Sequence, residues 1–252
     1  MQTKLKVTLL AHTPDADKVV AAAAKLCYSA ADVDTLMDGL TADKVEAMCQ
    51  KLADLGHESP IEHASYTFAV EGVSRALLAQ LTRHRIASYS VQSQRYVDKS
   101  DFDYIMPPEI AAIPEAAAKF EEIMEQLGTG YEELRTLLKN GHKDRLMAAG
   151  ADEKDADFKA GKMANEDARF VLPNACDTRI IFTMNARSLH NFFRLRCCNR
   201  AQWEIRAMAD EMLKLCREVS PVLFKSAGPS CAVTGKCSEG AYCCGEPRED
   251  LK

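Results

Sequence analysis

Two stretches of the chain are rich in arginine and contain no acidic residue. They are residues 72–97 and 178–203, and at the chain's average acidic content each would hold about four acidic side chains. Their basic residues are Arg75, Arg83, His84, Arg85 and Arg95 in the first stretch, and Arg179, Arg187, His190, Arg194, Arg196 and Arg200 in the second. Clustered guanidinium groups bind phosphates and other compact anions. The alternative is that both stretches form ordinary solvated helix faces whose arginines pair with acids elsewhere in the chain.

Helical spacing favours a bound ligand over that alternative. If residues 188–203 are mostly helical, one face carries Leu189, Phe192, Phe193, Arg196, Arg200 and Trp203. Burying a guanidinium without a partner costs free energy, and the stretch has no acid that could pair with Arg196 or Arg200. An anion or a planar polar ligand would resolve this conflict.

Two other faces of the predicted helices are also suited to a ligand. Arg187, Asn191 and Arg194 form a second polar surface at the start of the helix that follows residue 187. On a predicted helix at 74–85, Gln80 and Arg83 share a face with two alanines, whose small side chains would let a flat ligand approach the backbone.

Four of the ten cysteines crowd the C-terminal tail. They are Cys231, Cys237, Cys243 and Cys244. Four thiolates could bind a zinc ion, but the tail lacks the C-x₂-C pair typical of zinc fingers, and adjacent cysteines rarely bind one ion together. The alternative is a reduced, partly ordered tail, and we predict no metal site. Cys197 and Cys198 are predicted to pack against the strands.

The elements that position these residues are a few strands among many helices. Strands are predicted at 4–10, 66–73 and 180–184, and helices at 14–28, 41–56, 74–85, from 188 onward and at 201–219. Residues 107–140 are predicted to form two helices broken near Gly128 and Gly130, and 142–162 an exposed loop that leads into a further helix. The pattern predicts an α+β fold with one domain at 1–227 and an irregular Cys- and Gly-rich tail at 228–252.

Composition excludes several classes of protein. The chain has 252 residues, 47% of them hydrophobic, and a net charge of −5. A general nucleic-acid binder carries a large positive charge, and a membrane span needs about 20 consecutive apolar residues; neither feature is present. The N-terminus has no convincing signal peptide. We therefore expect a cytoplasmic protein with neither a nucleic-acid nor a membrane partner.

The first arginine-rich stretch contains an unusual motif at residues 83–96. Residues 83–96 read RHRIASYSVQSQRY: the triplet Arg83-His84-Arg85, seven residues, then Ser93, with Arg95 two positions further on. This segment resembles the signature of the flavin-dependent thymidylate synthases. Four further blocks occur in the order found in that family: GHESPIEH at 56–63, ARFVLP at 168–173, NARSL at 185–189 and AQWEIR at 201–206. Five ordered blocks make the resemblance specific.

The resemblance implies an enzyme that methylates dUMP to dTMP. The family binds FAD, takes its carbon from 5,10-methylenetetrahydrofolate and oxidises NADPH. Its members are homotetramers whose sites are shared between subunits, with helices packed around a small mixed or antiparallel sheet. No G-x-G-x-x-G fingerprint follows a strand in this chain, so its FAD site would have to differ from the Rossmann type.

Matching the family's motifs residue by residue implies a set of site residues. The FAD contacts are Ser59, Arg83, His84, Arg85, Asn185, Ala186, Arg187 and Asn191. The dUMP contacts are Gln80, Leu81, Thr82, Arg83, Ser93, Gln94, Arg95, Arg169 and Arg196. Arg196 is the implied catalytic residue, because a fixed positive charge beside the uracil ring would stabilise the charge that develops as the pyrimidine is activated.

The resemblance also implies a mechanism without a cysteine nucleophile. Reduced flavin would supply the hydride. Ser93 has no adjacent general base in the sequence, so we assign it to phosphate binding rather than to nucleophilic attack. The chain departs from some relatives at Ser90, Val91 and Arg200, where those relatives carry Asn, Glu and His.

Two readings from other classes remain open at this point. The basic stretches could serve a nucleotide- or RNA-binding module without catalysis, and bound flavin would separate that module from the enzyme. The tail could instead belong to a zinc-stabilised interaction protein, which would hold zinc and no flavin.

Overall fold

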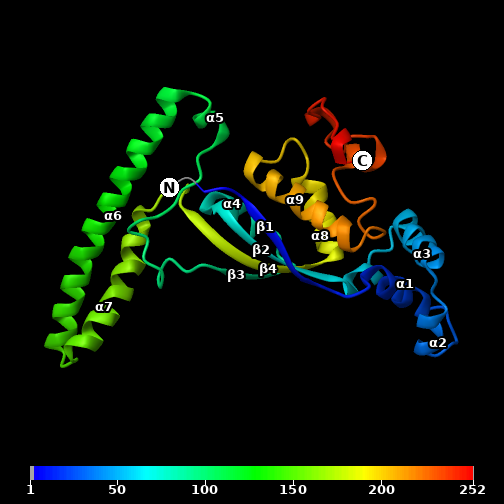
Figure 1. The fold of residues 1–252 in the computed structure, drawn as a ribbon, viewed down its shortest axis with the longest axis horizontal. Coiled ribbons are helices and arrows are strands. Elements are labelled where there is room, and N and C mark those ends of the chain that lie inside the picture. The colour runs from blue at the N-terminus through cyan, green and yellow to red at the C-terminus, as the bar shows by residue number, and fades with distance from the viewer. Residues whose placement is uncertain (1–2, 252) are drawn as a thin grey trace. The chain divides into compact units, whose positions relative to one another are not determined.

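One antiparallel sheet of four strands carries both arginine-rich stretches (Figure 1). Its strand order is β1-β2-β4-β3, with bounds β1 (Lys6–His12), β2 (Ser65–Ser74), β3 (Ser88–Val91) and β4 (Asp177–Asn185). These positions come from a computed structural model that describes residues 3–251. The predicted α+β fold with a small sheet is confirmed. The three predicted strands correspond to β1, β2 and β4, whereas the short strand β3 was not predicted.

The chain divides into two compact units. One comprises residues 3–6, 71–79 and 91–180, and the other residues 7–70, 80–90 and 181–251. The first unit contains α5 (Pro108–Ala111), α6 (Pro114–Ala148), α7 (Glu153–Ala168) and a 3₁₀ turn η2 (Arg169–Val171). The second contains α1 (Ala16–Leu26), α2 (Val33–Asp38), α3 (Ala42–Leu55), η1 (Pro60–His63), α8 (Ala186–Arg196), α9 (Trp203–Val219), α10 (Ser230–Thr234), η3 (Gly240–Tyr242) and η4 (Glu249–Leu251). Helix α4 (Arg75–Leu81) begins in the first unit and ends in the second.

Each arginine-rich stretch folds as a strand that runs directly into a helix. Strand β2 leads into α4, where the Ser74 hydroxyl accepts a hydrogen bond from the Leu77 N–H at 3.1 Å. Strand β4 leads into α8, where the Asn185 side chain accepts one from the Ser188 N–H at 2.9 Å. Both caps satisfy a backbone donor that the first turn of a helix leaves unpaired. Because β2 and β4 are neighbours in the sheet, the two strand–helix junctions belong to adjacent strands.

The core of the second unit is built from aromatic side chains. Those fully buried include Tyr66, Phe68, Phe182, Phe192, Phe193 and Phe224. The hydroxyl of Tyr66 donates to the Ser220 hydroxyl at 2.7 Å, so the polar end of this buried ring is satisfied. Phe192 and Phe193 anchor α8 to this core, as the predicted apolar face of that helix requires.

The predicted break near Gly128 and Gly130 is wrong. Helix α6 runs without interruption for 35 residues through both glycines and lies alongside α7 (Figure 1). Each glycine costs about 1 kcal/mol in helix propensity relative to alanine. Packing offsets this cost: Tyr131 is fully buried, and four buried alanines of α7 follow one another at four-residue spacing, Ala156, Ala160, Ala164 and Ala168. Small side chains on this face allow α6 and α7 to approach closely.

The exposed loop predicted at 142–162 is also mostly helical. Helix α6 continues to Ala148, and α7 begins at Glu153 with Asp152 as its N-cap, whose side chain accepts from the Asp155 N–H at 3.1 Å. The polar composition of this segment reflects charged side chains on a helical hairpin. Lys143, for example, forms an ion pair with Glu153 at 2.9 Å.

The continuous helix assumed for 188–203 ends earlier than expected. Helix α8 stops at Arg196, and α9 starts at Trp203, capped by the Gln202 side chain. Arg200 therefore lies outside the helix and is exposed, so its predicted place on the apolar face is wrong. The helix predicted at 74–85 likewise ends at Leu81, which places Arg83 in the turn that follows α4.

Glycine is required at one position of β2. Gly72 has a φ of +67°, and a Cβ there would lie 2.0 Å from the Lys4 carbonyl oxygen. Any larger residue would collide with that backbone. Within residues 3–251, no helix is long and apolar enough to cross a membrane. The boundary between a 1–227 domain and a 228–252 tail stays a prediction; α10, η3 and η4 give the tail three short helical segments.

Candidate functional site

Arg196, at the end of α8, makes its hydrogen bonds to neutral groups. Its Nε donates to Nε2 of His84 at 3.1 Å, its Nη2 to the Gln80 carbonyl at 3.3 Å, and its Nη1 to the Gln80 side-chain oxygen at 3.5 Å. The side chain is partly buried, and burial followed by the charge of Arg83 lowers the pKa of Arg196. Within the described part of the chain, this positive charge is held in place without a carboxylate to neutralise it.

His84 is the neutral side chain that accepts a hydrogen bond from Arg196. Its ring packs edge-on against Phe192, with ring centroids 4.9 Å apart. Burial, together with the nearby charges of Arg196 and Arg83, lowers the pKa of His84 to about 4. The imidazole is therefore neutral at physiological pH, with Nε2 accepting from Arg196 and the proton on Nδ1.

This environment makes the stability of the fold depend on pH. An unfolded histidine titrates near 6.5, so between pH 6.5 and 4 the unfolded chain takes up a proton that folded His84 does not. Stability contributed by His84 is present above pH 6.5 and is lost as the pH falls through this window. Between pH 7 and pH 4, urea unfolding should show the wild type losing about 1–2 kcal/mol more than a His84→Gln variant. If the free energy of unfolding changed with pH equally in the two proteins, the environment described for His84 would be contradicted.

Arg83 and Arg85 differ from Arg196 in being exposed. Among residues 3–251, neither guanidinium forms a hydrogen bond or an ion pair. The turn that carries them is closed by the Tyr89 hydroxyl, which lies 3.0 Å from the Leu81 carbonyl oxygen and 2.7 Å from that of His84. The triplet at 83–85 thus presents two uncompensated positive charges on a fixed turn.

The residues predicted around the start of α8 have several different roles. Arg187 is exposed and pairs with Glu58 at 3.0 Å and with Glu62 at 2.5 Å, so its partners are the acids of the 56–63 block. Asn185 caps α8, and Asn191 accepts from Arg194 at 2.9 Å. Ala186 is buried, and its N–H donates to the Ala64 carbonyl at 2.8 Å; Ser59 is exposed directly before η1.

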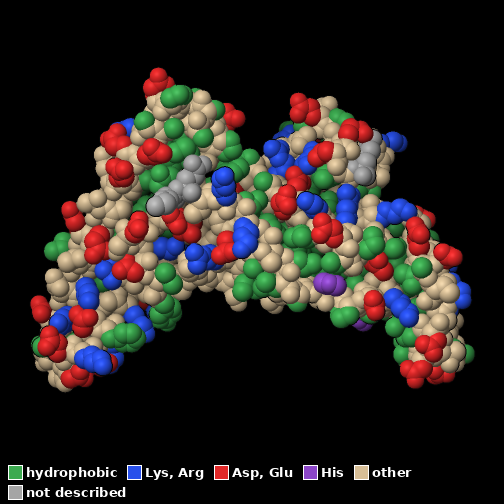
Figure 2. All heavy atoms as spheres, viewed as in Figure 1, with side chains coloured by type: hydrophobic (Ala, Val, Ile, Leu, Met, Phe, Trp, Pro, Cys, Tyr) green, Lys and Arg blue, Asp and Glu red, His purple; other side chains and the backbone are tan. Residues whose placement is uncertain are grey.

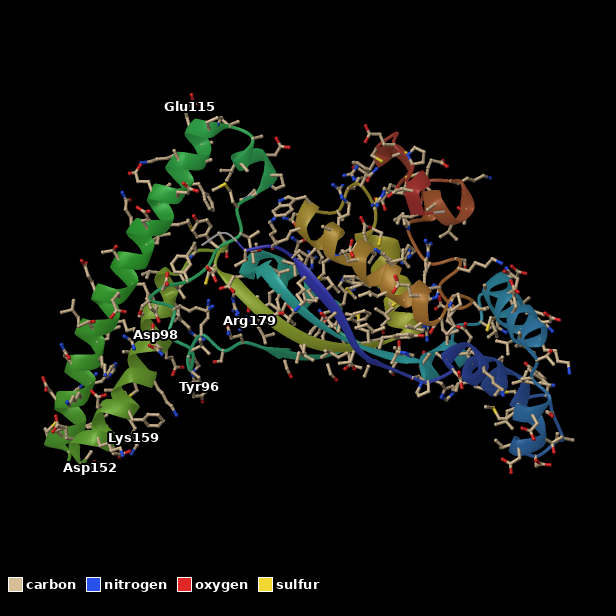
Figure 3. All side chains as sticks on the ribbon, viewed as in Figure 1. Tyr96, Asp98, Glu115, Asp152, Lys159 and Arg179 are labelled. Carbon is tan, nitrogen blue, oxygen red and sulfur yellow. The ribbon has the colours of Figure 1, made fainter. Side chains whose placement is uncertain are left out.

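A second group of residues predicted to bind dUMP lies in the first unit. Arg95 pairs with the Glu166 carboxylate at 2.8 Å, and Nε of Arg169 donates to the Glu166 carbonyl at 3.1 Å. Ser93 accepts from the Arg95 N–H at 3.2 Å, which makes a tight turn, and Gln94 donates to the Cys176 sulfur at 3.7 Å. Arg95 and Arg169 therefore both contact Glu166, Arg95 at its carboxylate and Arg169 at its backbone carbonyl. Tyr96 and Asp98, labelled in Figure 3, continue the chain beyond this turn.

Pairing with distant acids is common among the arginines of both stretches. Arg179, labelled in Figure 3, pairs with Glu71 at 3.6 Å, in the same way that Arg187 and Arg95 pair with glutamates. Acidic and basic side chains are interspersed over the face seen in Figure 2. Arg95, Arg179 and Arg187 are therefore solvated arginines paired with distant acids, as the alternative in the sequence analysis predicts. Among the residues that the structure describes, Arg83, Arg85 and Arg196 are not paired in this way.

Comparison with known proteins identifies the family to which the chain belongs. The family model described as thymidylate synthase complementing protein matches residues 8–222. The flavin-dependent thymidylate synthase of Clostridium tetani is 53% identical over 248 residues, which cover 98% of this chain and 96% of that protein. The chain belongs to the flavin-dependent thymidylate synthases. Its similarity extends to the enzyme of that name from Nitratidesulfovibrio vulgaris, at 49% identity over 97% of this chain and 96% of the relative, and to the one from Saccharolobus solfataricus, at 39% over 91% and 79%.

Membership of the flavin-dependent thymidylate synthases confirms the family predicted from the sequence motifs. It also confirms the predicted class of enzyme and FAD as its cofactor, with folate and NADPH as co-substrates. The assignment of individual site residues stays a prediction, and the geometry described above is the basis on which we assess it.

The residues at 83–85 fit the FAD of a flavin-dependent thymidylate synthase. FAD carries a diphosphate, and exposed guanidinium groups that are not paired with a carboxylate suit such an anion. Arg83 and Arg85 meet this condition, whereas Arg187 would have to share its charge with Glu58 and Glu62.

Sequence reasoning missed the residues that position the arginines. Glu166 binds Arg95 and Arg169, and the neighbouring Asn165 is buried, accepting from Arg135 at 2.7 Å and donating to the Arg95 carbonyl at 3.4 Å. The sequence does contain a signal for Glu166, because this residue precedes Arg169 by one helical turn. Tyr89, which closes the turn at 83–85, lies inside the motif but was assigned no role.

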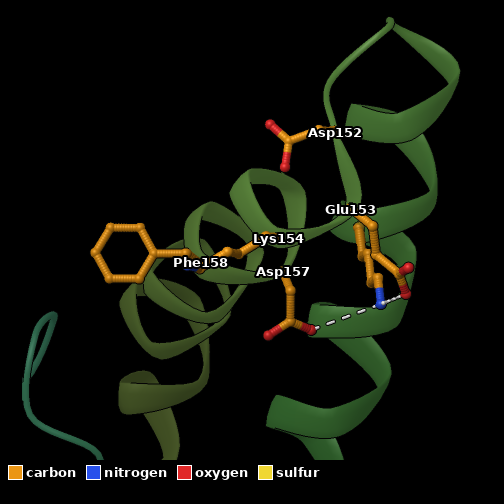
Figure 4. Close-up of a pocket in the computed structure, with 6 residues that line it drawn as sticks. Asp152, Glu153, Lys154, Asp157 and Phe158 are labelled. Atoms are coloured by element: carbon orange, nitrogen blue, oxygen red, sulfur yellow. Dashed lines mark hydrogen bonds and ion pairs between the residues drawn. The ribbon is translucent and has the colours of Figure 1, made fainter.

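A hollow of about 600 Å³ near the turn between α6 and α7 does not resemble a binding site (Figure 4). Two of its acidic side chains are already paired, because Lys143 contacts Glu153 at 2.9 Å and Asp157 at 3.8 Å. No residue predicted to bind dUMP or FAD lines it.

Proposed function

We propose that this chain converts dUMP to dTMP by reductive methylation, with 5,10-methylenetetrahydrofolate as carbon donor and NADPH as reductant. The observation that carries the proposal at the level of residues is Arg196, held by neutral His84 and by Gln80. A guanidinium bound only to neutral groups keeps its full charge for a ligand. Activation of the uracil ring places negative charge on that ring, and a preorganised positive charge stabilises it.

The neighbours of Arg196 orient the pyrimidine. Gln80 accepts from Arg196 through its oxygen atoms, so its side-chain amide N–H groups remain able to donate to the carbonyl groups of uracil. The turn that follows, Leu81 to Arg83, would place backbone groups and the Arg83 guanidinium against the nucleotide. Neutral His84 fixes the plane of the Arg196 guanidinium and adds no competing positive charge.

The group in the first unit would bind the phosphate of dUMP. Ser93 offers a hydroxyl, Gln94 a backbone N–H, and Arg95 and Arg169 two guanidinium groups. Glu166 uses only part of the hydrogen-bonding capacity of Arg95 and Arg169. Its role in the proposed site is to position both arginines.

When bound, FAD supplies the hydride chemistry that none of these side chains can provide. Arg83, His84 and Arg85 would hold it, together with Ser59, Ala186, Asn191 and the cap residue Asn185. Arg187 would orient the cofactor while it remains paired with Glu58 and Glu62.

Replacing Arg85 by alanine tests this assignment. The purified variant should retain at least about tenfold less FAD than the wild type, because it loses an unpaired guanidinium that would bind the diphosphate. Arg179→Ala is the matched control: it removes an exposed arginine that pairs with Glu71 and has no place in the proposed sites. Flavin absorbance per chain gives the readout, and circular dichroism checks the fold. Equal flavin content in the two variants would remove Arg85 from the proposed cofactor site.

A mechanism without a cysteine nucleophile is part of the proposal. Burial raises the pKa of Cys176 to about 11 and that of Cys49 to about 12, and it raises the pKa of Cys197 and Cys216 as well. A nucleophilic cysteine requires the thiolate, and these environments favour the thiol.

Cys197 is the most direct test of this mechanism because it adjoins Arg196. A Cys197→Ala variant should lose about 1–2 kcal/mol of stability, since a fully buried side chain is truncated. It should keep its turnover number within about threefold of the wild type. A folded, FAD-loaded variant that forms no dTMP would require a thiolate in the mechanism.

We also propose that the active enzyme is a homotetramer with shared sites. Two motif segments expose large apolar side chains, Ile86 at 75% and Phe170 at 83%, as expected of surfaces that another subunit covers. The substrate residues fall into two groups: one surrounds Arg196, and the other surrounds Glu166. The homotetramer, the cytoplasmic location and the absence of a nucleic-acid partner stay predictions.

A further inference from the structure

Five cysteines line one hollow in the second unit. The hollow has a volume of about 200 Å³, and its walls include Cys198, Cys231, Cys237, Cys243 and Cys244. All five are free thiols. They come from separate places in the chain: Cys198 from the loop between α8 and α9, Cys231 from α10, and the others from the tail that follows. The fold therefore brings together cysteines that the sequence separates by up to 46 positions.

One of these sulfurs already has a contact typical of a metal ligand. Cys243 accepts from the Gly245 N–H at 3.4 Å. The donor lies two residues after the cysteine. Backbone N–H groups directed at sulfur stabilise thiolate ligands and fix their orientation.

Cys244 does not belong to this set. Both Cys243 and Cys244 are exposed, but the Cys244 thiol donates to the Glu246 carbonyl at 3.4 Å. Of the adjacent pair Cys243-Cys244, only one sulfur therefore accepts backbone donors on the hollow. This removes the difficulty of two adjacent cysteines binding one ion. The remaining four, Cys198, Cys231, Cys237 and Cys243, match the composition of a structural zinc site with four cysteines.

The segments that carry these cysteines are held together by other contacts. Asn199 donates to the Glu246 carbonyl at 2.9 Å, and Arg200 donates to the Tyr242 carbonyl at 2.5 Å. Arg248 donates to the Cys197 carbonyl at 2.7 Å. The backbone around the hollow is thus fixed independently of any ligand. Arg200 also lines the hollow and would offset part of the negative charge of a zinc ion with four thiolates, while Glu239 and Glu246 on the same wall oppose it.

We propose that Cys198, Cys231, Cys237 and Cys243 bind one Zn²⁺ ion, which joins the C-terminal tail to the loop after Arg196. Among the described residues, no group of three or more His, Cys, Asp or Glu side chains is positioned to hold a metal ion. Zinc binding therefore requires the cysteine side chains to rotate into the hollow. Each thiol releases its proton to solvent as its sulfur binds the ion. The expectation from the sequence of no metal site is revised because Cys198, outside the tail, lines the same hollow as the tail cysteines.

Metal content of the full-length protein tests the proposal. The protein is purified without a histidine tag, in the presence of a reductant, from cells grown with added zinc, and zinc is measured by elemental mass spectrometry. We expect about one zinc per chain in the wild type and at least about a tenfold lower content in Cys198→Ser and Cys237→Ser. Cys244→Ser is the matched control and should keep the wild-type content. A wild type with less than about one zinc per ten chains, or equal loss in all three variants, would overturn the proposal.

A second measurement on the wild type does not depend on the variants folding. The thiols are alkylated with iodoacetamide before and after zinc is removed with a chelator, and the labelled cysteines are identified by mass spectrometry. Zinc should protect the four proposed ligands, whereas the exposed Cys27 and Cys244 react in both samples. Equal labelling in the two samples would count against a metal site. So would a protein that contains no zinc as purified and is two mass units lighter because Cys237 and Cys243 form a disulfide. The FAD content and the dTMP assay report separately on the proposed function.

Discussion

Replacing Arg196 by alanine should lower the rate of dTMP formation by at least about 100-fold. The variant loses a positive charge that is bound only by neutral groups, and removing one preorganised electrostatic contact to a transition state costs about 10²–10³ in turnover. The chain should still fold, because Arg196 is the last residue of α8 and Phe192 and Phe193 anchor that helix. Turnover number and KM for dUMP should be measured separately, together with a thermal unfolding curve.

Two further variants separate the charge of Arg196 from its position. Arg179→Ala removes an exposed arginine of the same arginine-rich stretch, one that pairs with Glu71, and should leave turnover within about twofold of the wild type. Arg196→Lys keeps the charge but cannot bond to His84 and Gln80 together, so its activity should lie between those of the wild type and the alanine variant. Wild-type turnover in a folded Arg196→Ala variant would refute the role proposed for this residue.

Mixing two inactive variants should restore activity if sites are shared between subunits. Arg196→Ala damages the group around Gln80 and His84, and Arg169→Ala damages the group around Glu166. If each site takes one group from each of two subunits, random assembly of equal amounts leaves about a quarter of the sites intact. Co-refolded or co-expressed chains should therefore recover about a quarter of the wild-type activity.

The choice of partner variant makes this experiment specific. Arg83 and Arg196 influence one another within one chain, since the charge of Arg83 lowers the pKa of Arg196. Both belong to the same group, so a mixture of Arg83→Ala and Arg196→Ala chains should stay inactive. Recovery in this control, or no recovery with Arg169→Ala, would show that the sites are not assembled from these two groups.

The parts of the fold that could be predicted are those with local signals. Strand β4 alternates buried and exposed residues, and Asn185 followed by a helical apolar pattern indicates the start of α8. The sequence motif at 83–96 is also local, because the triplet, Ser93 and Arg95 fall within one short segment. These features depend on neighbours in the sequence, and so the sequence displays them.

The errors occurred where tertiary packing decides the outcome. The glycines of α6 predict a break, but the alanine face of α7 and the burial of Tyr131 hold the helix intact. Local charge likewise could not reveal that Arg187 pairs with Glu58 and Glu62, or that Arg95 pairs with Glu166, because those acids are far away in the sequence. The cysteine hollow is a third case, since Cys198 is separated from its proposed partners by all of α9.

The most direct test of the central proposal is anaerobic turnover of dUMP by the purified, FAD-loaded protein. The assay contains 5,10-methylenetetrahydrofolate and NADPH, dTMP is quantified by chromatography, and each component is omitted in turn. We predict that dTMP forms only when NADPH and the folate are both present, that protein stripped of FAD forms none, and that Arg196→Ala lowers the rate by at least about 100-fold. A flavin-loaded wild-type protein that makes no dTMP in the complete mixture would contradict the proposed function.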